Sequence, residues 1–447
     1  MSDRREQVLK PFVQYADYMN DRVNTGIEMN RKAYANLRLV NREGNPVSGA
    51  HVEIRQKTHD FKYGANLFML GEMECEEKNA AYEQYFADAF NLATLPFYWC
   101  DLEPEQGKPR YAKDSPRVYR RPAPDLCLEF CEKHGIEPKA HCLVYDNFLP
   151  LWAYKDVATI KKLYVKRFQE LSERYAHRIP SWEVINETLW AFHGGHMPPR
   201  SKFMYADDYL EWSFDNVAKY FPENHLILNE YGMFGGNPAT TRAPYYMLIE
   251  RLLREGKRVD SIGFQFHRFV SEQDEAETAQ KDFDPMQTFR LLDLYAKFGL
   301  PMQITEVTLP AYRWTEEDED IQAEMLKNMY SIWFSQTNME AIIYWNLVDG
   351  YAAFAPLGDM TCGENRFAGG LIRHDLTPKK AYYTLRDLFR KTWHTETSAT
   401  SDPEGRTGFK GFYGEYDLEV TANGRTTPHE MHLTREYPYH EYTIVLD

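Results

Sequence analysis

Two glutamates lie where the sequence predicts the ends of buried strands. Glu187 closes a largely apolar run that begins at Trp182, and Glu306 closes a shorter run that begins at Ile304. Two carboxylates that flank a glycosidic bond can act as nucleophile and acid/base, with ~5–5.5 Å between them for retention of configuration and ~6.5–9.5 Å for inversion. Asn186, next to Glu187, is suited to donate to a sugar hydroxyl beside the reacting carbon. The pair therefore predicts glycoside hydrolysis.

Other polar and aromatic residues fall at the ends of further predicted strands. His267 is placed to hold a nucleophilic carboxylate in its ionised form, and polar residues that alternate along an inward-facing strand need partners. The predicted site consists of the catalytic Glu187 and Glu306 and the substrate-binding residues His141, Asn186, Gln265, His267, Trp345, Tyr145 and Tyr231.

Structural explanations compete with this assignment. A barrel carboxylate can simply pair with an arginine, and Glu230, a third acid at a strand end, is better explained by ordering Tyr231 or tuning the acid/base. His193 and His196 suggest a metal pair, but two glycines between them and the lack of a nearby third ligand favour a loop on the leaving-group side. No metal and no cofactor are therefore expected.

The elements that must position these residues follow an alternating pattern. From residue 61 onward, short apolar runs alternate with longer amphipathic stretches, as in repeated βα units. Eight such units predict an α/β fold with a closed (β/α)₈ barrel, whose active residues gather at the carboxyl ends of the strands. The predicted strands are 62–69, 90–95, 137–144, 181–187, 225–230, 261–267, 301–306 and 341–346.

The flanking segments look different from the barrel. Residues 1–35 predict a helix and linker, and residues 35–54 predict a β-hairpin with a turn at 42–46. Residues 408–447 show strand-like alternation again, and neither flank is long enough to be stable alone. We therefore expect both flanks to form one small accessory β-sandwich, with domains at 1–60 (helix and hairpin), 61–392 (catalytic barrel) and 393–447 (the completing strands).

Composition limits the partners. The 447 residues carry a net charge of −15, which argues against nucleic acid or an anionic membrane surface as a partner. No signal-like segment opens the chain and no run reaches the ~18 apolar residues of a membrane span, so a cytoplasmic protein is expected unless a leader was removed. The six cysteines show no metal-ligand spacing.

Several segments together resemble glycoside hydrolase family 10, the xylanase family. Residues 182–187 are similar to its acid/base strand, and residues 304–307 are similar to its nucleophile strand. Other matching positions are 90–91, 140–144, Pro150, Trp152, 228–231, 262–267 and Trp345, and the flanks 44–47 and 412–416 look like β segments of some bacterial relatives. The resemblance covers about residues 60–390. It implies a retaining mechanism with Glu187 as acid/base and Glu306 as nucleophile.

The chain departs from the family pattern on one side of the centre. Where the family carries Glu, Asn and Lys that grip xylose units on the non-reducing side, this chain has Thr94, Leu95 and Tyr98. Tyr145 stands for a tryptophan, and Thr308 stands for the aspartate two residues past the nucleophile. The glycone side is therefore expected to be blocked or altered, which favours exo action, short oligosaccharides or a sugar other than plain xylan.

The predicted function is a retaining β-glycoside hydrolase that acts on xylan-derived or related β-linked oligosaccharides through a covalent glycosyl-enzyme. One alternative is a carbohydrate-binding barrel with little or no catalysis, which the presence of both acids disfavours. A second is an exo-β-glycosidase for a non-xylan glycoside. A third is a metal-dependent barrel hydrolase, which would need clustered His and Asp ligands, whereas only His141 and His267 lie at predicted strand ends.

Overall fold

The computed structural model describes residues 3–189, 201–234, 242–436 and 441–446. The chain forms two compact units, one made of Met1–Ala16, Tyr63–Trp333 and Asn338–Tyr383 and the other of Asp17–Lys62, Phe334–Thr337 and Thr384–Asp447. The first helix therefore groups with the barrel, although it was predicted to belong with the flanking strands. The domain boundaries at 60 and 392 remain predictions.

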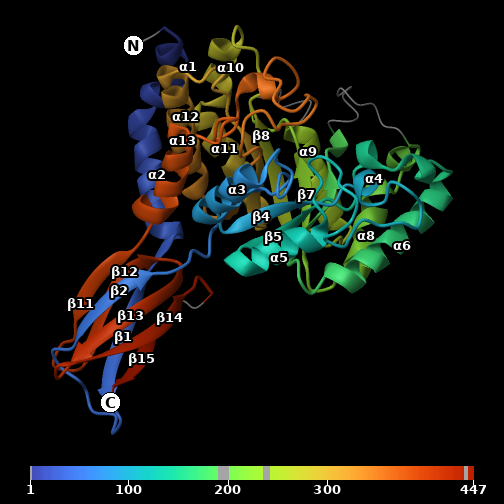
Figure 1. Ribbon diagram of the computed structural model, residues 1–447. Helices are drawn as coiled ribbons and strands as arrows, with labels where there is room; N and C mark the ends of the chain where they lie inside the picture. Colours follow the sequence, from blue (N-terminus) through green and yellow to red (C-terminus); the bar gives the residue numbers. More distant parts are fainter. Residues whose placement is uncertain (1–2, 190–200, 235–241, 437–440, 447) are drawn as a thin grey trace. The chain divides into compact units, whose positions relative to one another are not determined.

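The larger unit contains a closed parallel barrel of eight strands in the order β10-β3-β4-β5-β6-β7-β8-β9 (Figure 1), which confirms the predicted fold. Every position of β6 and β9 is buried, as expected for parallel strands that are covered on both faces. The barrel strands are β3 (Lys62–Asn66), β4 (Leu92–Pro96), β5 (Glu137–His141), β6 (Ser181–Asn186), β7 (His225–Glu230), β8 (Ser261–His267), β9 (Met302–Thr308) and β10 (Met339–Tyr344).

Helices connect these strands, and local signals set several of their ends. The Asp156 side chain caps α6 by accepting from the Thr159 N–H at 3.0 Å, and Gly135 ends α5 in the left-handed conformation. Among the described residues, no helix has the length and apolar character that a bilayer crossing requires. The helices are α3 (Glu76–Ala89), α4 (Trp99–Leu102), α5 (Pro124–His134), α6 (Val157–Tyr175), α8 (Tyr209–Tyr220), α9 (Ala243–Arg254), α10 (Glu275–Asp282), α11 (Pro285–Tyr295), α12 (Glu316–Phe334) and α13 (Lys380–Asp387).

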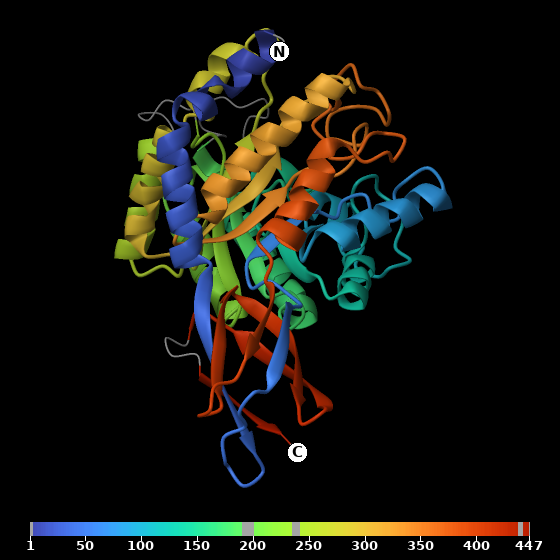
Figure 2. The same cartoon turned by 90° about the vertical axis from the view of Figure 1, so that its left-hand side faces the viewer.

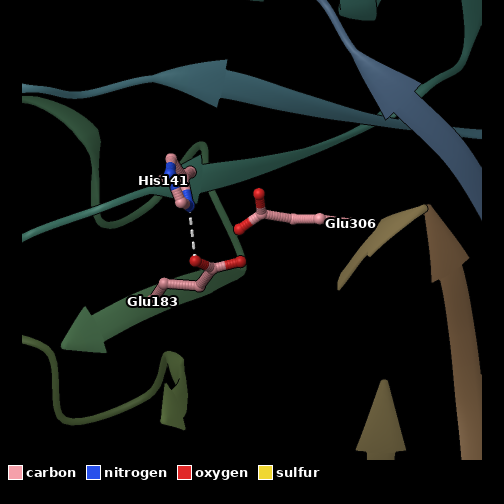
Figure 3. A group of neighbouring side chains, drawn as sticks. All are labelled: His141, Glu183 and Glu306. Atoms are coloured by element: carbon pink, nitrogen blue, oxygen red, sulfur yellow. Dashed lines mark hydrogen bonds and ion pairs between the residues drawn. The ribbon is translucent and has the colours of Figure 1, made fainter. Parts of the chain in front are cut away.

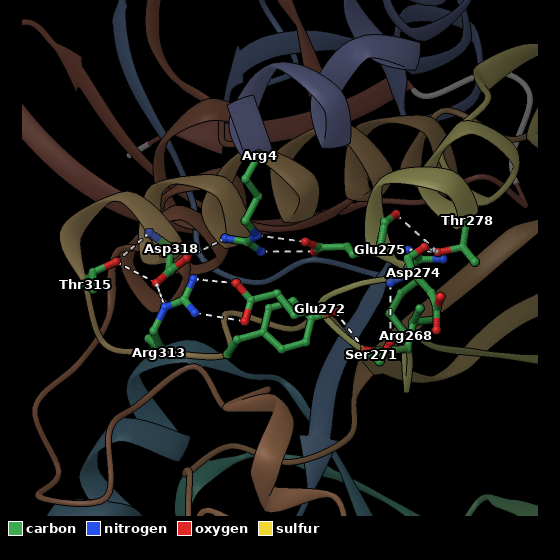
Figure 4. Close-up of polar contacts among 12 residues, drawn as sticks. Arg4, Arg268, Ser271, Glu272, Asp274, Glu275, Thr278, Arg313, Thr315 and Asp318 are labelled. Carbon is green, nitrogen blue, oxygen red and sulfur yellow. Dashed lines mark hydrogen bonds and ion pairs between the residues drawn. The ribbon is translucent and has the colours of Figure 1, made fainter. Parts of the chain in front are cut away.

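Two helices precede the first strand, α1 (Asp3–Gln14) and α2 (Ala16–Asn30). Arg4 of α1 makes two hydrogen bonds to Glu275, at 2.7 and 3.0 Å, and a third to Asp318 at 2.6 Å (Figure 4). Asp318 also accepts from Arg313, which grips Glu272 with both terminal nitrogens. The nearly buried carboxylates of Glu275 and Asp318 thus each meet a guanidinium, which fixes α1 to α10 and to the start of α12.

The smaller unit is built from strands of both ends of the chain, as predicted. One sheet has the order β12-β1-β15 and the other β11-β2-β13-β14, so N-terminal strands lie between C-terminal ones (blue and red in Figure 2). Both sheets contribute to one hydrophobic core. The strands are β1 (Lys32–Asn41), β2 (His51–Gln56), β11 (Glu396–Thr400), β12 (Arg406–Phe412), β13 (Gly414–Ala422), β14 (Arg425–Leu433) and β15 (Glu441–Leu446).

The predicted N-terminal β-hairpin is wrong. Strand β1 pairs with β12 and β15, whereas β2 pairs with β11 and β13, so the two strands belong to different sheets. Leu37 and Leu39 of β1 and Val52 and Ile54 of β2 are all buried in the same core. The alternation of apolar and polar residues therefore belongs to two strands that face each other across a sandwich. Two strands of a hairpin would show the same alternation in the sequence.

Candidate active site

Glu187 and Glu306 lie at the carboxyl ends of β6 and β9, the end of the barrel at which reacting groups gather in such folds. Glu306 is only 3% exposed, and Glu187, the first residue after β6, is half-buried. Glu187 has a φ of 56°, in the left-handed region that costs a non-glycine residue ~1–3 kcal/mol. Its N–H donates to the Asn229 carbonyl at 3.1 Å, which helps to hold this conformation.

The Asn229 side chain on β7 connects the residues of the centre. Its Nδ2 lies 3.0 Å from Glu306 Oε1, 2.8 Å from Asn186 Oδ1 and 3.2 Å from Glu183 Oε2, and its Oδ1 accepts from the Thr305 hydroxyl. Gly263 on β8 makes room for this amide, because a Cβ there would lie 2.6 Å from Asn229 Oδ1. The small residue Gly263 on β8 thus leaves space for the Asn229 amide on β7 and its hydrogen bonds, which we call the polar hub.

Two neutral donors hold the Glu187 carboxylate. Tyr145 donates its hydroxyl to Oε2 at 2.6 Å, and Gln265 donates its amide to Oε1 at 2.9 Å. Gln265 Nε2 also lies 3.3 Å from Asn186 Oδ1, which already accepts from Asn229. Both acceptor positions of the Asn186 oxygen are therefore used, and its Nδ2 group is the part left for a ligand.

His267 contacts Glu306 through Nε2, which lies 3.1 Å from Oε2, while its Nδ1 lies 2.9 Å from the Thr308 hydroxyl. Burial lowers the pKa of His267 to about 4, so the ring is neutral near pH 7. The contact to Glu306 is therefore a hydrogen bond from a neutral imidazole, and Nδ1 accepts from Thr308. Rings of Tyr231 and Phe269 lie nearly parallel to the imidazole, at 6.1 and 4.7 Å between centroids.

A buried charged group lies next to Glu306 (Figure 3). Glu183 Oε1 is 2.6 Å from the Lys139 amine, and Oε2 is 2.5 Å from His141 Nδ1. Burial raises the pKa of Glu183, but Lys139 and His141 outweigh that effect and lower it to about 2. Burial lowers the pKa of His141, yet the Glu183 carboxylate more than compensates and raises it. Glu183 is thus ionised between two donors.

Among the described residues, ligand-type atoms of His141, Glu183 and Glu306 lie within 4.8 Å of one another. This group does not suit a divalent cation. Both nitrogens of His141 already face partners, Nδ1 Glu183 and Nε2 the Tyr98 hydroxyl at 3.0 Å, and Lys139 already supplies a positive charge to Glu183.

The Glu306 carboxyl has a raised pKa. Burial is the largest cause, and the negative charges of Glu183 and Glu187 add to it, while His141 and the Asn229 amide oppose it. Because Glu187 is close enough to act on Glu306, the two carboxyls share one electrostatic environment. Burial and the neighbouring carboxylates therefore favour the protonated form of Glu306 more than His141 and Asn229 oppose it.

Aromatic rings cover the part of the centre that β3, β4, β5 and β10 surround. Trp345 is 6% exposed, and its ring lies 5.3 Å from that of His141 and 5.9 Å from that of His267. Phe68 and Tyr98 form one buried cluster with it. Trp345 therefore lies beside both imidazoles of the centre.

The fold brings all nine predicted site residues into one region, although their roles remain proposals. His193 and His196 lie outside the described residues. Glu230 accepts from the N–H groups of Tyr231 and Leu189, at 2.9 and 2.7 Å, and so orders the backbone at two strand ends. Four further residues of the centre were not predicted as site residues: Lys139, Glu183, Tyr98 and Asn229. A charged residue inside an apolar run, such as Glu183, was the available signal, because it needs a buried partner.

Comparison with known proteins finds a matching family model and several proteins of similar sequence. The model of Glycosyl hydrolase family 10 matches residues 66–388. The anti-sigma-I factor RsgI6 of Acetivibrio thermocellus is 25% identical over 422 residues, which cover 92% of this chain and 47% of that protein, so the chain spans about half the length of this relative. Endo-1,4-beta-xylanase A of Halalkalibacterium halodurans is 23% identical over 381 residues, covering 77% of this chain and 92% of the xylanase.

Solved structures share the barrel. Native xylanase 10B of Thermotoga maritima superposes with a TM-score of 0.59 at 22% identity, covering 74% of this chain and 96% of that one. Xylanase 10B of Thermotoga petrophila, solved in complex with xylobiose, gives a TM-score of 0.58 at 22% identity, covering 74% and 95%. At this identity the likeness establishes the fold.

Proposed function

Because the chain belongs to glycosyl hydrolase family 10, we propose that it is a retaining β-glycoside hydrolase acting on xylan-derived or related β-linked oligosaccharides. The observation that carries the proposal is the pair of carboxylates at the ends of β6 and β9, which one amide network joins. Asn229 contacts Glu306 and Asn186, and Gln265 contacts Asn186 and Glu187. This chemistry uses two carboxyl groups and needs no metal ion.

In the first step Glu306 is the nucleophile. Its carboxylate attacks the anomeric carbon as the bond from that carbon to the leaving oxygen breaks, and Glu187 gives its proton to that oxygen. His267 and Asn229, which each donate to one oxygen of Glu306, hold the attacking group in place. Asn186 Nδ2 is available for a sugar hydroxyl next to the reacting carbon.

In the second step, a water molecule displaces Glu306 from the anomeric carbon. Glu187, now a carboxylate that accepts from Tyr145 and Gln265, takes a proton from the water as the oxygen attacks the anomeric carbon. The ester bond to Glu306 breaks, and the product keeps its original configuration. The altered glycone side, from Thr94 to Tyr98, favours short oligosaccharides.

The substitution Glu306→Gln tests this proposal. We expect turnover of aryl β-glycosides and xylo-oligosaccharides to fall by about 10³-fold or more, while oligosaccharide binding survives, because the amide keeps the shape but cannot attack. Glu340→Gln is the matched control, since Glu340 is a partly buried carboxylate at the opposite end of the barrel. Unchanged turnover in Glu306→Gln would refute the assignment.

A further inference from the structure

The carboxyl ends of the barrel strands form a rim around Glu306 and Glu187, and this rim has two unlike halves. On the half formed by β7 and β8, polar side chains such as Asn229 and Gln265 reach the carboxylates. On the half formed by β10, β3, β4 and β5, aromatic rings pack on one another. An oligosaccharide that places one bond between the two carboxylates must extend its glycone over one of these halves.

The aromatic half is filled by ring-to-ring contacts. Phe68 lies edge-on to Trp345 and to Tyr98, with centroids 5.3 and 5.9 Å apart, and Tyr98 stacks on Phe148 at 4.1 Å. Phe68, Tyr98 and Trp345 are only 1%, 5% and 6% exposed. Rings that line an open sugar groove expose a face for stacking, whereas these faces are covered by neighbouring rings.

A cation fixes the Tyr98 ring from another direction. The Arg121 guanidinium carbon lies 4.3 Å from the Tyr98 centroid, within the range of a cation–π contact. Arg121 is itself held by Asp101 Oδ2 at 2.7 Å and by the Arg120 carbonyl at 2.9 Å. Tyr98 therefore contacts both Phe148 and Arg121, which also lie close to each other, and its displacement by a second sugar would break all of these contacts.

The only polar atom of the Tyr98 side chain lies next to the catalytic network. Its hydroxyl is 3.0 Å from His141 Nε2, and His141 in turn is bonded to Glu183 beside Glu306. Burial raises the pKa of Tyr98 well above its usual value, so the phenol keeps its proton. The Tyr98 hydroxyl is therefore a neutral hydrogen-bonding group next to His141.

We propose that the glycone extends over the aromatic half and that Tyr98, held by Phe148 and Arg121, closes this half behind a single sugar, so that the protein removes one sugar at a time from the non-reducing end of β-linked oligosaccharides. This inference rests on the proposed function for its chemistry. It adds the mode of cleavage and the residue that sets it. Tyr98 is a specificity-determining residue, because its ring excludes a second glycone unit.

The test compares p-nitrophenyl β-xyloside, with one glycone unit, and p-nitrophenyl β-xylobioside, with two. We expect wild type to favour the xyloside by about tenfold or more in kcat/KM, and Tyr98→Ala to reduce this ratio by about tenfold or more. Phe148→Ala, which removes the ring stacked on Tyr98, should shift the ratio in the same direction. Tyr98→Phe keeps the ring, so the ratio stays within about threefold while KM rises about two- to tenfold for both substrates.

A second measurement does not depend on turnover. A crystal structure of Glu306→Gln soaked with xylotriose should show one xylose ring on the Tyr98 side of the two carboxylates. Two rings on that side, or a wild type that prefers the xylobioside, would overturn the closed glycone half. One ring there without turnover of either glycoside in wild type would support the closure and reject the proposed hydrolysis, so the two failures are distinguishable.

Discussion

The two ends of the barrel bury carboxylates in opposite ways. At the amino ends of the strands, Glu340 Oε1 accepts from Ser261 and Gln303 at 2.8 Å each and meets His225 Nε2 at 3.1 Å. Burial raises the pKa of Glu340, but these partners outweigh it and lower the pKa. Burial lowers the pKa of His225, but the Glu340 carboxylate outweighs it and raises the pKa. The Glu340 carboxylate thus faces partners on Ser261, Gln303 and His225, which favour its ionised form.

At the carboxyl ends of the strands the charges do not balance. Glu183, Glu187 and Glu306 gather there, and among the described residues Lys139 and His141 neutralise chiefly Glu183. Burial, together with the charges of Glu183 and Glu187, therefore raises the pKa of Glu306. The contrast shows that burial alone does not set the pKa of a barrel carboxylate, because the supply of partners differs between the two ends.

The largest expected difference between the ends is catalytic. Glu187→Gln should lower kcat about 10²- to 10⁴-fold for substrates with poor leaving groups, because the proton donor is lost. Activated aryl glycosides, whose leaving groups need little protonation, should lose much less. Steady-state rates over a leaving-group series measure this, with Glu340→Gln as the control that should stay near wild type. An equal loss for all leaving groups would contradict the role of Glu187 as acid.

A smaller effect should follow from crowding the polar hub. Gly263→Ala places a Cβ 2.6 Å from Asn229 Oδ1 and 2.9 Å from Thr305 Cγ2. The hub must shift, so we expect kcat to fall about tenfold or more and the unfolding free energy to fall by about 1–3 kcal/mol. Denaturant unfolding and steady-state kinetics check both. A variant with wild-type kcat would show that Asn229 does not position Glu306.

The smallest effect is on stability, and it has opposite signs at the two ends. Glu306→Gln should raise the free energy of unfolding by about 1–2 kcal/mol near pH 7, because it removes a buried carboxylate that lacks full compensation. Glu340→Gln should lower it by about 1 kcal/mol, because a charged hydrogen-bond acceptor is lost at a site one-third exposed.

The pH dependence of these changes follows from the pKa shifts. Because the folded pKa of Glu306 is raised, wild type loses stability relative to Glu306→Gln as pH rises from 4.5 through that raised value. Glu340 has a lowered folded pKa, so the stability that it contributes is present above pH 4.5 and is lost as pH falls through the folded pKa. His225 has a raised folded pKa, so the stability that it contributes is present below pH 6.5 and is lost as pH rises through the folded pKa. Glu340→Gln should therefore cost most between pH 4.5 and 6.5. Thermal melts of Glu306→Gln and Glu340→Gln from pH 4 to 8 measure both pH dependences. Changes in melting temperature that are equal at all pH values would contradict the comparison.

Much of the barrel could be predicted from the sequence, because each buried strand leaves an apolar run followed by polar residues. Strand β7 was predicted with the residues that the structure shows, and Glu187 and Glu306 were placed at strand ends. The pairing of β1 and β2 could not be predicted, since alternation does not tell which sheet a strand joins. The contacts of Asn229 and Tyr98 depend on which side-chain atoms meet inside the barrel, and the order of the strands does not specify that.

The central claim is that Glu306 forms a covalent bond to the sugar. Incubation with a 2-deoxy-2-fluoro β-xyloside that has an activated leaving group should trap this intermediate, because the fluorine slows its hydrolysis. We predict that peptide mapping by mass spectrometry finds one fluoroxylosyl group on Glu306 in the wild type and none in Glu306→Gln. A label on Glu187 or Glu230, or turnover that yields a product of inverted configuration, would contradict the account.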